Sequence, residues 1–257
     1  MAFDEVEERY RAPALDKGLD ILELLAETEE GLSQAEIAKA LSRSPNEIYR
    51  MLDRLVRRGY IARMPTDRYE LTLKLFALAH RHAPMRRLVS QAVPVLRDFA
   101  RAAGQSCHLA VYDRGEVIVV AQVDSPSYWG IAVRVGARVG LFDTGSGHIL
   151  LAFATPTERK LMAEEHEMMP LETRPIDLDA RLAEIVKRGY EQMESRQTPS
   201  VVNLSVPILG PHGSIIAAMT CPYVQRLDTE APGQAAVVKL LQASGAAISA
   251  NAGGAEQ

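Results

Sequence analysis

Two helix-start signatures in quick succession constrain this chain more than any other feature of its sequence. In "SQAE", Ser33 can cap a helix while Glu36, three residues later, completes a capping box. In "SPNE", Ser44 and Glu47 repeat the arrangement, and Pro45 takes the first helical position, where its missing N–H costs nothing. The two boxes predict a short helix, a tight turn and a second helix that begins at a defined residue.

The neighbouring segments predict the rest of a small unit. An amphipathic helix before Gly31 is indicated by helical spacing of its inward residues, which are Leu15, Leu19, Leu22 and Leu25 with Ile21 and Leu24 beside them. The inner stripe of the helix that begins at Pro45 is Ile48, Leu52 and Leu55, flanked by Met51 and Val56, and Gly59 suits its end. "YIARMPTDRYELT" alternates around a turn and predicts a hairpin. Together these elements form a winged helix-turn-helix.

Basic charge is concentrated on this unit. The whole chain has a net charge of −4, yet between Lys39 and Arg68 eight basic residues stand against three acidic ones, 8 − 3 = +5. In a helix-turn-helix the N-terminal residues of the last helix enter the major groove, where Asn and Arg can read adenine and guanine edges. We therefore predict double-stranded operator DNA as a partner. The expected contact residues are Ser33, Gln34, Arg43, Ser44, Pro45, Asn46, Tyr49, Arg50, Arg54, Arg63 and Arg68.

Length and composition indicate an ordinary globular protein. The chain has 257 residues, 47% of them hydrophobic, an acidic N-terminal segment "MAFDEVEERY" and no run of about 18 apolar residues. We therefore expect a cytoplasmic protein with no membrane partner. Cys107 and Cys221 are isolated, which predicts small core residues rather than a disulfide framework.

Beyond Leu71 the sequence mixes helices and strands. A linker helix is expected to end near Pro84, and Pro94 is expected to interrupt the pattern again. The expected strands are "CHLAVYD", "EVIVVAQV", "WGIAVRVG", "VVNLSVPIL" and "SIIAAMTCPY", and the expected helices are "GHILLAF", "TPTERKLMAEEH", "LDARLAEIVKRGY" and the Ala- and Leu-rich C-terminal segment. Because strands and helices do not strictly alternate, the pattern favours an α+β fold with an antiparallel sheet flanked by helices.

Catalytic and metal motifs are not recognised. "TGSGH" brings Ser146 close to His148, but its glycines stand at the wrong offsets for a nucleophile elbow. The six histidines, among them His80 and His82, show no metal-ligand spacing. The expectation is therefore no enzyme activity, no catalytic residues, no metal and no cofactor. The glycines around Ser146 instead suit a helix start that offers N–H groups to an anion, or merely a turn.

The order of these motifs resembles the IclR-type (isocitrate lyase regulator) family of transcriptional regulators. The resemblance rests on "LDKGLDILELLAE", "GLSQAEIAKAL", "SPNEIYRMLDRLVRRGYIAR", "HLAVYDRGEVIVVAQVDSP", "VRVGARVGLFDTGSGHILLAF" and "VPILGPHGSIIAAMTC". It implies a homodimer or homotetramer that represses or activates transcription, and a GAF-like domain that binds a small effector. Its pocket would be formed by Tyr128, Trp129, Ile131, Gly145, Ser146, Gly147, His148, Val201, Asn203, Thr220 and Cys221.

The sequence thus predicts five consecutive regions. They are an N-terminal tail at 1–12, the winged helix-turn-helix at 13–72, a linker helix at 73–90, the effector-binding domain at 91–252 and a C-terminal tail at 253–257. The interpretation is a ligand-responsive transcriptional regulator, whose effector we expect to be a small organic or sugar-derived acid. A metabolite sensor whose winged unit binds another protein is the alternative, and an enzyme the third.

Overall fold

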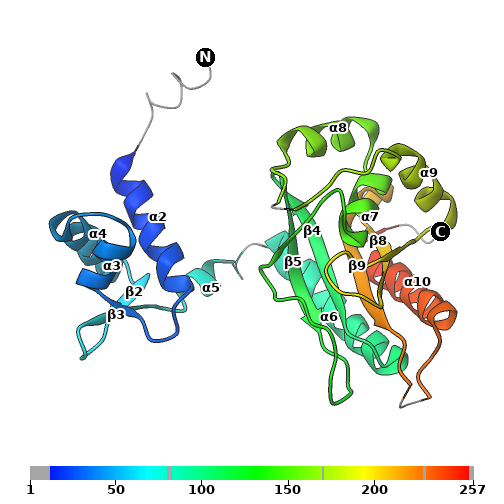
Figure 1. The fold of residues 1–257 in the computed structure, drawn as a ribbon, viewed down its shortest axis with the longest axis horizontal. Coiled ribbons are helices and arrows are strands. Elements are labelled where there is room, and N and C mark those ends of the chain that lie inside the picture. Colours follow the sequence, from blue (N-terminus) through cyan, green and yellow to red (C-terminus); the bar gives the residue numbers. More distant parts are fainter. Residues whose placement is uncertain (1–11, 80, 82, 170, 228–229, 255–257) are drawn as a thin grey trace. The chain divides into compact units, whose positions relative to one another are not determined.

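A computed structural model describes residues 12–79, 81, 83–169, 171–227 and 230–254. These residues pack as two compact units, one ending at Ala83 and the other beginning at Pro84 (Figure 1). His80 and His82, considered above as metal ligands, lie outside the described residues.

The first unit is a winged helix-turn-helix. Its elements are α2 (Pro13–Ala26), β1 (Leu32–Ser33), α3 (Gln34–Ala40), α4 (Pro45–Arg57), β2 (Ile61–Arg63), β3 (Arg68–Leu71) and α5 (Lys74–Ala79). The strands form an antiparallel sheet in the order β1-β3-β2. Both capping boxes are confirmed, because each serine accepts the N3 backbone N–H and each glutamate accepts the N-cap N–H. Between α3 and α4 the chain turns at Ser42, whose φ is 53°.

The first helix buries only the C-terminal part of the stripe that was predicted. Ile21, Leu22 and Leu25 lie in the core, whereas Leu15 and Leu19 are 61% and 47% exposed. The helix also ends at Ala26, well before Gly31. Gly31 instead allows the following loop to approach β3, where a Cβ would lie 2.6 Å from the Tyr69 carbonyl oxygen. Leucine spacing alone could not show which of two adjacent faces the other helices would cover.

The segment predicted as one linker helix contains the whole of one short helix and the start of another. Helix α5 ends at Ala79, and α6 (Ala83–Ala103) continues through Pro94. Leu88 and Ala92 of α6 pack in the core of the second unit. The predicted interruption at Pro94 is therefore wrong. A proline need not end a helix, because a helix can accommodate it at a kink.

The second unit is an antiparallel six-stranded sheet with helices on both faces. Its strands are β4 (Cys107–Asp113), β5 (Glu116–Val123), β6 (Arg138–Val139), β7 (Glu191–Glu194), β8 (Val201–Leu209) and β9 (Ile215–Val224). The strand order is β6-β5-β4-β9-β8-β7. Its other helices are α7 (Gly145–Phe153), α8 (Pro156–Glu165), α9 (Leu178–Arg188) and α10 (Gln234–Asn251), with the short turn η1 (Pro211–Gly213) between β8 and β9.

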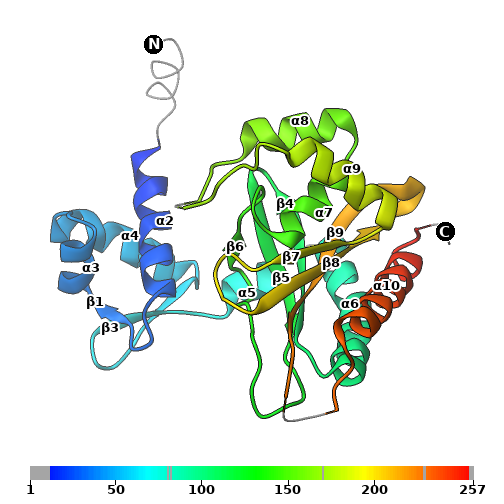
Figure 2. The same cartoon turned by 45° about the vertical axis from the view of Figure 1, so that its right-hand side comes forward.

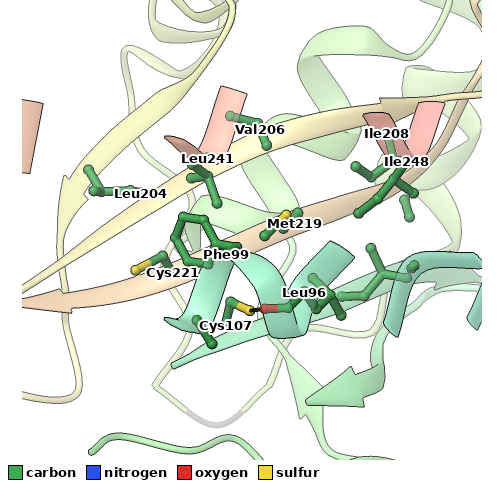
Figure 3. Packing of buried hydrophobic residues seen from close by; sticks show 14 of the residues in the cluster. Leu96, Phe99, Cys107, Leu204, Val206, Ile208, Met219, Cys221, Leu241 and Ile248 are labelled. Atoms are coloured by element: carbon green, nitrogen blue, oxygen red, sulfur yellow. Dashed lines mark hydrogen bonds between the residues drawn. The ribbon is translucent and has the colours of Figure 1, made fainter. Parts of the chain in front are cut away.

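Each face of this sheet has its own core. Helices α6 and α10 cover one face, and α7, α8 and α9 cover the other (Figures 1 and 2). Figure 3 shows Phe99 and Leu241 packed against Met219 and Cys221 on the first face. Both cysteines are buried there and unpaired. Their prediction as small core residues is confirmed.

Two parts of the sheet differ from the sequence prediction. "WGIAVRVG" forms no strand, and the edge strand beside β5 is instead the two-residue β6. Conversely, the sequence did not predict strand β7, whose residues show no apolar alternation. This strand lies at the edge of the sheet and pairs only with β8. None of the described helices is both long and apolar enough to cross a membrane.

We expect Gly31→Ala to destabilise the winged unit by roughly 2–4 kcal/mol, since φ is +62° and the new Cβ would collide with the Tyr69 carbonyl. Gly59→Ala is the matched control. It also has a positive φ, +72°, but its Cβ would meet nothing nearer than 4.0 Å, so it should cost only the backbone penalty. Thermal unfolding followed by circular dichroism checks the difference, and equal losses would contradict it.

Candidate DNA-binding face and ligand cavity

Helix α4 presents a polar face that begins at a fixed residue. Ile48 and Leu52 hold its inner side in the core, while Asn46, Tyr49 and Arg50 are exposed on the outer side. Pro45 and the Ser44 cap define the first turn, and the Gln34 side chain donates to the Pro45 carbonyl at 3.0 Å. This bond holds α3 against the first turn of α4. It therefore fixes the distance between the two helices close to the exposed Asn46.

The arginines of this unit divide into paired and unpaired groups. Arg57 pairs with Asp53 at 3.0 Å and Arg63 pairs with Asp67 at 2.5 Å. Within the described part of the chain, no ion pair involves Arg43, Arg50 or Arg54, all of them exposed. Exposed unpaired cations are the groups that can neutralise phosphates with least competition.

Arg68 has a structural role that the sequence did not indicate. Its guanidinium donates to the carbonyls of Glu30 and Gly31 and pairs with Glu36 at 3.2 Å. It therefore ties β3 to the loop before α3 and to the α3 capping box. This bracing competes with the phosphate contact expected from the sequence.

A cavity of about 640 Å³ opens in the second unit at the N-terminal end of α7. Its floor is formed by residues of β4, β8 and β9, and its walls by residues 131–133, 138–140, 143–146, 169, 171–172 and 195–198. The volume lies within the range typical of small-molecule sites.

A chain of hydrogen bonds crosses the cavity floor. The Ser146 hydroxyl lies 3.4 Å from His108 Nε2 and 2.8 Å from the Thr220 hydroxyl, which lies 2.8 Å from the Ser205 hydroxyl. All four side chains are buried. Burial lowers the pKa of His108 to about 4, so its imidazole is neutral at pH 7.

Helix α7 begins at the cavity and is packed very closely. The Thr144 hydroxyl accepts the Gly147 N–H at 3.0 Å and donates to the Gly140 carbonyl at 2.6 Å. A Cβ on Gly147 would lie 2.1 Å from the Leu141 carbonyl oxygen, and one on Gly145 would lie 2.4 Å from the Ser205 hydroxyl. Glycine is therefore needed at both positions to bring the helix start against the sheet.

Two buried histidine–glutamate pairs hold the loop before α7. His148 Nε2 donates to the Phe142 carbonyl at 2.8 Å, and its Nδ1 faces Glu191 at 3.0 Å. The Phe142 N–H donates to Glu172 at 2.8 Å, which also pairs with His166 at 2.9 Å. Burial opposes ionisation of both glutamates, but their hydrogen bonds hold each pKa below the usual value.

The charged residues of the cavity walls are of both signs. Arg138 pairs with Glu116 at 3.0 Å, and Arg196 donates to the Thr173 hydroxyl. Asp143 is buried, and burial together with the charge of Glu172 raises its pKa. A carboxyl whose pKa is raised is more readily protonated, which lowers its repulsion of an anionic ligand.

Six of the residues expected in the pocket line this cavity: Ile131, Gly145, Ser146, Val201, Asn203 and Thr220. Gly147 and His148 do not, because close packing against Leu141 and the bonds to Glu191 and Phe142 occupy them. Cys221 follows Thr220 on β9 and therefore points into the core on the opposite face.

The two aromatic residues expected in the pocket also lie outside its wall. The Arg226 guanidinium lies over the rings of Tyr128 and Trp129, 5.3 and 5.7 Å from their centroids. Trp129 is 43% exposed and Tyr128 is 83% exposed.

The sequence did not indicate several residues that line the cavity, among them His108, Arg138, Asp143, Glu172 and the 195–198 segment with Arg196. Only His108 had a usable signal, since it alternates with apolar residues of "CHLAVYD". Within the described ranges, no three His, Cys, Asp or Glu side chains gather into a group that could hold a metal ion.

A DNA-binding winged unit followed by a unit with a ligand cavity defines a ligand-responsive transcriptional regulator. Residues 14–65 match the family model described as the IclR helix-turn-helix domain, and residues 80–250 match the bacterial transcriptional regulator IclR C-terminal model. The chain belongs to the IclR family of bacterial transcriptional regulators. The predicted family, fold class and regulatory rather than enzymatic function are confirmed.

Individual relatives agree with this assignment. The HTH-type transcriptional regulator BhcR of Paracoccus denitrificans is 31% identical over 214 residues, which cover 80% of this chain and 76% of BhcR. The regulator KdgR of Escherichia coli is 26% identical over 212 residues, 80% of each chain. The crystal structure of the Thermotoga maritima IclR is 25% identical, with a TM-score of 0.73 over 95% of this chain and 100% of that one.

A further crystal structure supports the fold. It is of an IclR homologue from Microbacterium hydrocarbonoxydans in complex with 4-hydroxybenzoate. It has a TM-score of 0.77 at 23% identity and covers 93% of this chain and 98% of that one.

We expect acidification to destabilise the second unit through His108. In the unfolded chain the His108 imidazole has a pKa near 6.5, whereas burial lowers its pKa to about 4 in the folded protein. The stability that this difference contributes is complete above pH 6.5 and falls by roughly 2 kcal/mol between pH 7 and 4.5. Chemical unfolding followed by the fluorescence of Trp129, the single tryptophan, should show a shallower pH dependence in His108→Phe. His212→Asn, at an exposed histidine, is the control. Parallel profiles for wild type and His108→Phe would refute the prediction.

Proposed function

We propose that this regulator reads its operator with the N-terminal half of α4 and binds phosphates with the surrounding arginines. Asn46 and Arg50 lie one helical turn apart, both exposed, and Arg50 has no ion pair among the described residues. Tyr49 and Arg54 flank them, while Arg43 and Arg63 lie on the preceding turn and on the wing. The unpaired arginines beside an exposed Asn are the observation that carries this assignment. Ser33, Gln34, Ser44 and Pro45 hold the two helices in the necessary geometry, and Arg68 supports the wing.

We propose that the effector is a small organic acid bound at the start of α7. Thr144 caps only the Gly147 N–H, which leaves the N–H groups of Gly145 and Ser146 in the cavity wall for an anion. Arg196 adds positive charge, and Asn203 adds an amide that can orient the ligand. The Microbacterium homologue, which binds 4-hydroxybenzoate, supports a carboxylic acid as the ligand class.

We further propose that the chain acts as a homo-oligomer on a pseudo-palindromic operator. One recognition helix reads few base pairs, so tight binding needs two copies on half-sites about 34 Å apart or a multiple of it. Large apolar side chains are exposed on α2 and around α5: Leu15, Leu19, Leu73, Phe76 and Leu78. Such a set on one small unit is typical of a protein interface.

For DNA, we expect Arg50→Ala to lose about 1–3 kcal/mol of binding and to relax specificity at one base position. Arg54→Ala, which removes an exposed arginine without an ion pair among the described residues, should weaken binding to all sequences and reduce the salt slope by about one. Arg101→Ala, at an exposed arginine on α6, is the control. Gel retardation of an operator selected from random DNA, across salt concentrations, gives these values. An Arg50→Ala variant with wild-type affinity and specificity would remove Arg50 from the interface.

For the effector, we expect carboxylic acids such as 4-hydroxybenzoate, lactate and malate to include at least one that raises the melting temperature of the protein. Asn203→Ala should weaken the binding of that acid roughly tenfold, because a polar contact is lost. Asn251→Ala, at the exposed end of α10, should bind as the wild type does. Calorimetric titration measures the affinity for the acid. If Asn203→Ala binds it as tightly as Asn251→Ala does, Asn203 is not part of the binding site.

For assembly, we expect light scattering to show a dimer or tetramer. The double substitution Leu15→Glu and Leu19→Glu should weaken assembly and operator binding together, because it places charge on the exposed apolar face of α2. Leu161→Glu, 51% exposed on α8, is the matched control. A wild-type protein that stays monomeric at micromolar concentration and still binds its operator tightly would disprove the proposal.

A further inference from the structure

A second cavity of this unit adjoins the ligand cavity, because Asp143 and Arg196 line both of them. Its volume is about 650 Å³, which is within the range typical of small-molecule sites. Helix α9, the edge strand β7 and residues 173–176 border it (Figure 2). We call it the arginine cavity, since three arginines line it: Arg174, Arg181 and Arg196.

Neutral groups, rather than carboxylates, hold the arginines of this cavity. Arg196 donates to the Thr173 hydroxyl, and the Arg174 guanidinium lies over the Phe142 ring, 5.1 Å from its centroid. Among the residues that the structure describes, none of the three arginines takes part in an ion pair. Two of these guanidiniums are thus held in position while their charge stays uncompensated.

Most N–H groups of these guanidiniums remain available to a ligand. A guanidinium has five N–H donors in a planar fork and no acceptor. The bond to Thr173 uses one donor of Arg196, and contact with a ring face leaves the donors at the edge of Arg174 free. Arg174 and Arg196 are exposed and Arg181 is half-buried, so a solute can reach all three.

Two carboxylates also line the cavity and do not cancel its positive charge, 3 − 2 = +1. Asp143 is buried, and burial together with the charge of Glu172 raises its pKa, although Arg196 opposes this rise. Glu194 is exposed on β7, so water screens its charge. An anion that enters the arginine cavity therefore meets a net attraction.

We propose that the arginine cavity binds the phosphate group of a small phosphorylated metabolite, as a second effector site beside the organic-acid site. A phosphate monoester has three free oxygens and a charge of about −1.5 to −2 at pH 7, so it can accept from several guanidiniums at once. A carboxylate has two oxygens and a single charge and would leave part of the arginine set unused. The volume of the cavity leaves room for the organic part of the ester.

Arg196 couples the two sites, because its one side chain lines both cavities. Two anions that share a guanidinium compete for its charge and repel each other. A phosphate ester in the arginine cavity therefore weakens the binding of an organic acid in the first cavity, and the acid weakens the binding of the ester by the same factor. Arg196→Gln should weaken both ligands, whereas Arg181→Gln should weaken only the ester.

Calorimetric titration of the full-length protein with inorganic phosphate and with glycerol 3-phosphate, at pH 7 and constant ionic strength, tests the site. One molecule of each should bind per chain, and Arg174→Gln and Arg181→Gln should bind them roughly tenfold more weakly or worse. Arg174→Lys should be intermediate, since it keeps the charge and loses the planar fork. Arg97→Gln is the matched control, because it removes an exposed arginine from α6 on the other face of the sheet.

The two probes also distinguish the source of the phosphate group. Tighter binding of glycerol 3-phosphate supports an ester, whereas equal affinity would show that free phosphate is the occupant and would overturn the ester. Melting temperature and operator retardation without ligand should match the wild type in every variant, which shows that the variants fold.

Two further results would overturn the second site. One is failure of both probes to bind the wild type. The other is an equal loss of affinity in Arg97→Gln and Arg181→Gln, which would show that the anions follow the net charge of the protein and not the cavity. Both results leave the organic-acid site standing, because Asn203 and the start of α7 are tested separately with carboxylic acids.

Discussion

The alternation of side chains along β4, β9 and β8 is the constraint on which the ligand-binding unit depends. On β9, Met219 and Cys221 face the core under α6 and α10, while Thr220 between them faces the cavity. The same period of two separates Leu204 from Asn203 on β8. Because a register slip of one residue would exchange the two faces, the apolar core also fixes the position of every polar group on the cavity floor.

The cavity wall depends on close backbone contacts rather than on flexible side chains. Gly145 and Gly147 let α7 approach the sheet and the Leu141 carbonyl. The two histidine–glutamate pairs then hold Phe142 by its N–H and its carbonyl. Polar residues that a motif would assign to the ligand, such as His148, are therefore used to position the helix start, and the groups left for a ligand are few and fixed.

In the winged unit, ion pairing separates structural arginines from those available to DNA. A local excess of basic residues is visible in the sequence, but Arg57 is compensated by Asp53, and Arg68 by Glu36 and two carbonyls. Because an internally bonded arginine must give up those bonds to bind a phosphate, the unpaired Arg43, Arg50 and Arg54 carry the proposed interface.

The sequence by itself determined what depends on near neighbours in the chain. The Ser33 and Ser44 caps, the hairpin between β2 and β3, and the end of α4 at Gly59 are local, since hydrogen bonds between residues close in the chain define them. Tertiary structure alone decided which stripe of α2 is buried, that Cys221 turns away from the cavity, and that His108 meets Ser146, 38 residues along the chain. The physical reason is that burial and long-range hydrogen bonds depend on which elements pack together, and helical or strand periodicity does not contain that information.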